Sequence, residues 1–184
     1  MTQARLIISP KSSSNIPAKT ADIKQALKEA GLTANEFRNN AYYAGNNFIS
    51  LVSFLGCSPN IQLTPEDGEN FCFVEFSDTY PHSQLLGYCL SVKPKCPYCK
   101  AKIENWKDTA EYQLASSLYL CRKCNTVMPL SDLKWRQEGG YGHISISITN
   151  IHPHEAVPAE KILHVLKDAS NFEWDYFYAN NEIT

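Results

Sequence analysis

The sequence lacks any apolar run long enough to cross a membrane. A membrane-spanning helix needs about 20 consecutive apolar residues, whereas the longest apolar run here, 48–55, is short and is interrupted by Ser50 and Ser53. The first residues also lack the apolar core and the small-residue cleavage site of a secretion signal. We therefore expect a soluble, cytoplasmic protein with no membrane partner.

The chain also lacks the composition of a disordered protein and any phosphate-binding loop. Hydrophobic residues make up 43% and charged residues 20% of its 184 residues, which is enough to bury a core in one domain, or in a domain with a small extra module. The net charge of −2 gives no global argument for nucleic-acid binding. Asp67-Gly68 and Gly139-Gly140 indicate turns, and neither belongs to a phosphate-loop motif.

Hydrophobic periodicity predicts a mixture of strands and helices. Strands are expected at 5–9, 71–76, 143–149 and 171–179, and helices at 20–30 and from Pro158 onward. The run 48–55 fits either a helical face or a buried strand. The last strand carries Phe172, Trp174, Tyr176 and Tyr178 on one face. Such a face is typical of a core, and a base-stacking platform is the alternative.

The two predicted helices align with each other. DIKQALKEAG matches KILHVLKDAS, with Ile23 opposite Ile162 and Leu27 opposite Leu166. This match predicts two related strand–helix–strand units, although two generic amphipathic helices would produce it too. The expected fold class is α+β, a sheet with helices on one face and two pseudo-symmetric βαβ halves. Residues 1–91 and 137–184 would form its body, and 92–136 an inserted module.

Four of the seven cysteines form two Cys-x-x-Cys pairs separated by 21 residues: Cys96, Cys99, Cys121 and Cys124. Two cysteines on a tight turn can point at one ion, and two such turns complete a tetrahedron of thiolates. We therefore predict a metal site at these residues. Reduced core thiols or disulfides are the alternatives, and iron is the chemical alternative to zinc. The intervening residues suffice for a hairpin, with 103–106 and 117–120 as its strands.

The paired Cys-x-x-Cys turns resemble a zinc ribbon of the rubredoxin-like group, over about residues 92–135. In that group a glycine commonly follows the second cysteine of each turn, where φ is positive. This sequence has Lys100 and Asn125 there, and of these two asparagine tolerates the left-handed region better. A zinc ion with four cysteine ligands has no open position, so the site is expected to be structural.

Charge is distributed unevenly along the chain. Residues 92–136 hold nine basic and four acidic residues, a net charge of +5, whereas the remainder holds eight and fifteen, a net of −7. The basic segment favours an anionic partner, or it balances the −2 charge of four thiolates with Zn²⁺. Nucleic acid would be bound by Lys100, Lys102, Lys107, Arg122 and Lys123.

Three functions are compatible with these patterns. The first is a non-enzymatic zinc protein whose metal supports a surface for a protein partner or for self-association, and it requires the fewest assumptions. The second is nucleic-acid binding through the basic segment. The third is an enzyme on the body, with a polar pocket near Cys57, His152 or His154. These positions are otherwise expected to be a packed thiol and a polar loop, and no residue is predicted to be catalytic.

Overall fold

The computed structural model describes residues 4–11, 20–55, 61–65 and 71–180. Its helices are α1 (Thr20–Ala30), α2 (Phe48–Leu51) and α3 (Glu160–Ser170). Its strands are β1 (Arg5–Pro10), β2 (Thr33–Arg38), β3 (Ala41–Ala44), β4 (Val52–Phe54), β5 (Phe73–Phe76), β6 (Gln84–Tyr88), β7 (Leu118–Leu120), β8 (Val127–Pro129), β9 (Gly139–Gly142), β10 (Ile146–Thr149), β11 (Ala156–Pro158) and β12 (Trp174–Ala179). In these parts of the chain no helix has the length and apolar character that spanning a membrane requires.

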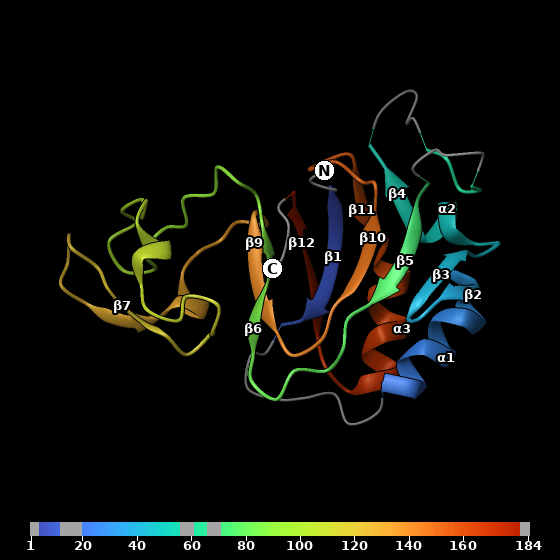
Figure 1. Ribbon diagram of the computed structural model, residues 1–184, viewed down its shortest axis with the longest axis horizontal. Coiled ribbons are helices and arrows are strands. Elements are labelled where there is room, and N and C mark those ends of the chain that lie inside the picture. Colours follow the sequence, from blue (N-terminus) through green and yellow to red (C-terminus); the bar gives the residue numbers. More distant parts are fainter. Residues whose placement is uncertain (1–3, 12–19, 56–60, 66–70, 181–184) are drawn as a thin grey trace.

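The main sheet has six strands in the order β12-β1-β10-β5-β3-β2, and every neighbouring pair is antiparallel. Helices α1 and α3 lie side by side on one face of this sheet (Figure 1). The predicted α+β fold, with helices on one face of the sheet, is therefore confirmed.

The topology contains two interleaved strand–helix–strand units. From β1 the chain runs through α1 and the β2–β3 hairpin to β5, which lies on the far side of β10. From β10 it runs through α3 to β12, which lies on the far side of β1. Each unit thus holds two parallel strands with a strand of the other unit between them, the split arrangement of β-α-β units.

The core lies between the sheet and the two helices. Alternate residues Leu6 and Ile8 of β1 face the helices, and the helical stripe residues Ile23, Leu27, Ile162 and Leu166 meet them there, all fully buried. Burying one such side chain contributes roughly 1.5–3 kcal/mol to folding. The periodicity that predicted the helices therefore reflects one shared apolar interface.

The aromatic face of β12 belongs to this core. Trp174 and Tyr178 are buried, and their polar atoms have partners: Trp174 Nε1 donates to Ser170 Oγ at 2.8 Å, and Tyr178 Oη donates to the Ala156 carbonyl at 2.7 Å. Satisfied polar atoms on buried rings are typical of packing. These two rings are therefore core residues and do not form a base-stacking platform.

The run 48–55, which fitted a helix or a strand, contains one of each. Phe48 and Leu51 are buried on the single helical turn α2. The chain then becomes extended at the β-branched Val52, and β4 pairs with β11. Both interpretations of the sequence were therefore partly correct.

A two-stranded ribbon, β6 paired with β9, packs on the sheet face opposite the helices. Leu86 of the ribbon joins Ile7 of β1 and Phe177 of β12 in a small apolar cluster. Residues 92–136, here called the cysteine segment, connect the two strands of this ribbon, so the segment leaves and returns at neighbouring points (Figure 1). The division of the chain into a body and an inserted module stays a prediction.

Replacing Gly140 with alanine is expected to loosen the ribbon. A Cβ atom at this position would lie 2.4 Å from Cε1 of Phe177, which is well inside van der Waals contact. We expect Gly140→Ala to lower the free energy of unfolding by about 1–3 kcal/mol, measured by urea denaturation. The double variant Gly140→Ala/Phe177→Leu should regain part of that loss, because leucine leaves room for the methyl group. Unchanged stability of the single variant would contradict this packing.

Candidate metal centre

Each Cys-x-x-Cys pair lies in a tight loop closed by an antiparallel bridge. Lys95 pairs with Lys102 around the first loop, and Leu120 pairs with Val127 around the second. Because each loop is clamped at its base, the two cysteines of a pair project from neighbouring points of one short turn. The metal-binding geometry therefore begins with local backbone structure.

The two loops share one hydrogen-bond pattern. In the first, the N–H of Cys96 donates to the Ala101 carbonyl at 2.9 Å, and the N–H of Lys100 donates to the Cys96 carbonyl at 3.1 Å. The second loop repeats both bonds, Cys121 to Thr126 at 2.9 Å and Asn125 to Cys121 at 2.8 Å. The repeated pattern is compatible with the zinc-ribbon resemblance of the sequence.

Lys100 and Asn125 take the left-handed backbone conformation expected after the second cysteine. Their φ angles are 61° and 54°, although neither residue is glycine. The conformation costs roughly 1–2 kcal/mol for a residue with a side chain. The Lys100 ammonium donates to the Pro97 carbonyl at 2.6 Å within the same loop, and this contact helps to offset the cost at the less favourable residue.

The four sulfurs converge on one point. The Sγ atoms of Cys96 and Cys124 are 3.8 Å apart, those of Cys99 and Cys121 are 3.7 Å apart, and all four lie within 4.8 Å of one another. Sulfurs about 2.3 Å from one tetrahedral ion are about 3.8 Å apart, whereas a disulfide bond measures about 2.05 Å. The cluster therefore has metal-binding spacing, and within the described ranges it is the one group of its kind.

Hydrogen-bond donors surround the more exposed sulfurs. The backbone N–H groups of Ala101 and Thr126 donate to Cys99 and Cys124, and the Thr126 hydroxyl lies 3.3 Å from Cys124 Sγ. The hydroxyl and the N–H of Thr126 lower the pKa of Cys124 to about 6. Donors directed at sulfur favour the thiolate, which is the form that binds metal. At Cys99 the lowering by the Ala101 N–H is outweighed by burial and by the neighbouring cysteines, which raise the pKa of that thiol to about 11.

A small apolar cluster supports the site. Trp106 packs edge-on against Trp135, with ring centroids 4.8 Å apart, and the rings of Tyr88 and Tyr141 extend the stack into the β6–β9 ribbon. The buried ligands Cys96 and Cys121 belong to the same cluster. The cysteine tetrad and this core therefore pack together within the cysteine segment.

The predicted strand pairing in this segment is wrong. Residues 103–106 do not pair with 117–120. Instead β7 pairs with β8, and Trp106–Asp108 form a 3₁₀ turn. The second Cys-x-x-Cys loop is itself the hairpin connection, so the nearest partner for β7 is the chain that follows. The short apolar run Val127-Met128-Pro129 was the signal that sequence reasoning missed.

The return from the cysteine segment to the body is a fixed turn. Arg136 and Gln137 have φ angles of 53° and 63°, two adjacent left-handed residues. The backbone N–H of Tyr178 in β12 donates to the Gln137 carbonyl at 2.9 Å. The junction is thus held by the main sheet itself.

Three of the five basic residues proposed for nucleic acid come together. Lys102, Arg122 and Lys123 line one groove of about 330 Å³, beside Tyr119 and Cys121. The other two are engaged locally. Lys100 bonds Pro97, as described above, and the Lys107 ammonium lies 4.1 Å from the ring centroid of Tyr88.

The two histidines named for a site on the body lie outside the pockets found in the described part of the chain. The side chains of His152 and His154 are exposed, neither lines any pocket described here, and the His154 ring packs 4.8 Å from that of Tyr178. Cys57 lies outside the described residues. Elsewhere Cys72 is buried, and burial, with a smaller effect of the Glu155 charge, raises its pKa to about 12. That thiol is a core residue.

Serine substitutions in the tetrad should remove the metal. We expect purified protein kept under reducing conditions to hold one metal ion per chain, and Cys96→Ser or Cys121→Ser to lose it, because a tetrahedral site loses a buried ligand. Mass-spectrometric metal analysis and near-ultraviolet circular dichroism from Trp106 and Trp135 provide the measurements. Cys89→Ser is the matched control, since Cys89 is buried outside the tetrad. Metal retained by both tetrad variants would contradict the assignment.

Metal retention should also depend on Thr126. The pKa of Cys124 lies below its ordinary value of 9.0. Its thiolate therefore contributes fully to the stability of the folded chain above about pH 9, and this contribution is lost as the pH falls through about 6. Thr126→Val removes the hydroxyl donor and raises this pKa. The midpoint of metal release on acidification, followed with a chromogenic chelator, should therefore move to higher pH. Thr109→Val is the control, and an unmoved midpoint in Thr126→Val would exclude the hydroxyl's role.

Comparisons with family models, with curated proteins and with solved structures find no match to this chain. The metal centre is therefore supported by its own geometry. Four cysteines on two matching loops lie at metal-binding distance, and their packing makes them part of a small core.

Proposed function

We propose that this protein is a non-enzymatic zinc-binding protein, in which a structural zinc ion rigidifies a hairpin that binds a protein partner. The observation that carries the proposal is the exposed apolar face of the β7–β8 hairpin, next to the tetrad of Cys96, Cys99, Cys121 and Cys124. The zinc has a structural role and leaves no coordination position for a substrate.

The ligand set supports zinc, with iron as the alternative. Four thiolates in a tetrahedron suit both metals. Zinc binding to small modules provides apparent free energies of roughly 10–16 kcal/mol, which is enough to order a segment with a small core. Metal analysis separates the two, and an iron site would in addition absorb visible light.

The outer face of the hairpin is apolar and exposed. Leu118, Leu120 and Val127 are 64%, 53% and 55% exposed. Their neighbours along the strands, Tyr119 and Met128, point inward and are buried. Leu120 and Val127 are direct cross-strand partners, so the exposed side chains are contiguous. A contiguous exposed apolar patch is typical of an interaction surface. Figure 1 shows this hairpin projecting away from the main sheet.

The surroundings of the patch indicate the chemistry of its partner. Arg122 and Lys123 lie in the loop between β7 and β8 and are exposed, and the cysteine segment has a net charge of +5. Opposite charges around an apolar centre increase the rate and specificity of association. The partner proposed is therefore a protein surface with an apolar centre and an acidic rim.

Nucleic-acid binding is the second candidate, and the groove lined by Lys102, Arg122 and Lys123 is the observation that favours it. Tyr119 at this groove is buried, which leaves little ring surface for stacking on a base. Three cations are also few beside the six to ten phosphate contacts of strongly salt-dependent DNA binders. The apolar hairpin face therefore ranks first.

Photo-crosslinking can test the proposed surface. A photoreactive amino acid at Leu120 should trap a protein partner in cells that express the chain, whereas the same group at Ile49 should not. The two positions are matched, being 53% and 55% exposed, but Ile49 lies on the body. Leu120→Glu should abolish partner binding, because a charge at the centre of an apolar contact is costly to bury, whereas Ile49→Glu should leave it intact.

The outcomes separate the candidates. Equal crosslinking at Leu120 and Ile49, or none at either, would reject the hairpin surface. Crosslinks to RNA or DNA, with binding lost in a Lys102→Gln/Arg122→Gln/Lys123→Gln variant, would support nucleic acid instead. Sedimentation of the purified chain shows whether the trapped partner is a second copy.

A further inference from the structure

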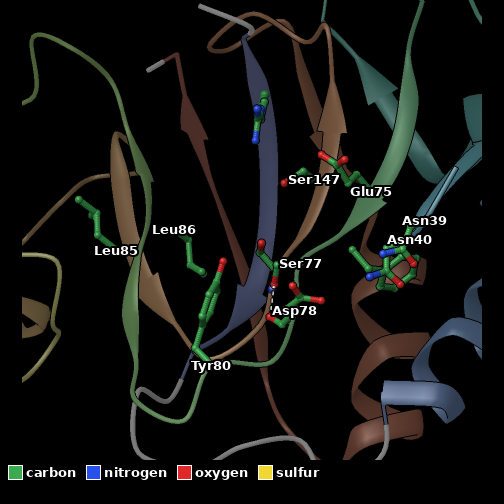
Figure 2. Close-up of a pocket in the computed structure, with 12 residues that line it drawn as sticks. Asn39, Asn40, Glu75, Ser77, Asp78, Tyr80, Leu85, Leu86 and Ser147 are labelled. Carbon is green, nitrogen blue, oxygen red and sulfur yellow. Dashed lines mark hydrogen bonds between the residues drawn. The ribbon is translucent and has the colours of Figure 1, made fainter. Parts of the chain in front are cut away.

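A polar pocket lies on the body, on the sheet face opposite the helices, and no function proposed above uses it. It has a volume of about 340 Å³. Figure 2 shows Tyr80, Leu85 and Leu86 on one side of it, Asn39 and Asn40 on the other, and Glu75 with Ser147 between them. Its volume is at the lower end of the range for small-molecule sites, 300–1,000 Å³.

Strand alternation explains why the floor of the pocket is polar. Leu6 of β1, Ile148 of β10 and Val74 of β5 face the helices in the core. Their chain neighbours therefore point the other way. These neighbours include Arg5, Ser147 and Glu75, and all three line the pocket. Three strands distant in sequence thus bring a cation, a hydroxyl and a carboxylate to one concave surface.

Two features of the floor point to a ligand. Ser145 and Ser147 are only 5% and 6% exposed, so they are hydroxyl-bearing residues that are buried yet still line a pocket. Nε of Arg5 is buried without a hydrogen-bond partner among the residues that the structure describes. A buried donor without a partner costs about 1–3 kcal/mol, and an anionic group that enters the pocket would accept a charge-assisted bond from this side chain.

The charges around the pocket restrict the class of ligand. Glu75 and Asp78 line it together with Arg5, and Glu75 is paired with Arg38 at 3.0 Å. The negative charges of Glu75 and Asp78 are balanced by the positive charges of Arg5 and Arg38. A phosphate-rich ligand would face both carboxylates, whereas a ligand with one anionic and one cationic group is complementary to Arg5 and to the acidic side chains.

We propose that this pocket binds a small zwitterion of the class of free α-amino acids with an apolar side chain. The carboxylate lies toward Arg5 and the buried serines, the ammonium group toward Glu75 and Asp78, and the apolar side chain against Leu86 and Tyr80. The site contains none of the four cysteines and no residue of the hairpin, so its test requires neither the metal nor the proposed partner.

L-Leucine is the probe, added to the ¹⁵N-labelled full chain and followed by amide chemical shifts. We expect saturable shifts at the backbone amides of Ser77, Ser145 and Ser147. L-Leucinamide lacks the carboxylate and 4-methylpentanoate lacks the ammonium group, so each should bind at least about tenfold more weakly. Shifts of equal size and midpoint for leucine and leucinamide, or tighter binding of inorganic phosphate, would overturn the proposal.

Two variants and a control complete the test. Arg5→Gln should abolish the leucine response, and Arg136→Gln, which changes an arginine outside the pocket, should preserve it. Arg5 is partly buried, so a second variant is needed in case Arg5→Gln does not fold. Asp78→Asn, at the exposed rim of the pocket, provides it. That variant should weaken leucine binding and leave 4-methylpentanoate unaffected. Undiminished leucine binding in a folded Arg5→Gln protein, or no saturable shift in the wild-type chain, would refute the site.

Discussion

The order of the cysteine segment depends on the convergence of four sulfurs from two loops that are 21 residues apart in the chain. The hydrogen bonds of each loop fix only its own pair of cysteines. The sulfurs of the two loops meet at 3.7 and 3.8 Å, and thiolates at that distance repel one another unless a cation lies among them. The neighbouring aromatic cluster packs against the buried ligands Cys96 and Cys121, so the tetrad and this cluster stabilise the segment together.

The β6–β9 ribbon connects the cysteine segment to the main sheet. On one side Tyr88 and Tyr141 stack with Trp106 and Trp135. On the other side Leu86 packs with Phe177 of the main sheet. The ribbon therefore contacts the aromatic cluster of the cysteine segment on one side and the main sheet on the other.

Local sequence signals predicted more of the fold than of the sites. The stripes of α1 and α3 and the two Cys-x-x-Cys turns are short-range patterns, and each was confirmed in the structure. The strand predicted at 143–149 forms as β10, but it is shorter and all four of its residues are buried. The partner of β7 was missed because hairpin pairing depends on turn geometry more than on composition. The pocket at Arg5 and Ser147 could not be predicted at all, because strand order is a property of the folded sheet and not of any local run of residues.

The two left-handed residues at the exit from the cysteine segment have a consequence for recognition. A flexible tether would let the hairpin point in many directions, and a partner would then have to immobilise it at an entropic cost. Here Arg136 and Gln137 both have left-handed backbones, and the Gln137 carbonyl accepts a hydrogen bond from β12. The hairpin is therefore preorganised, since its orientational freedom is already lost when the chain folds and not when it meets another molecule.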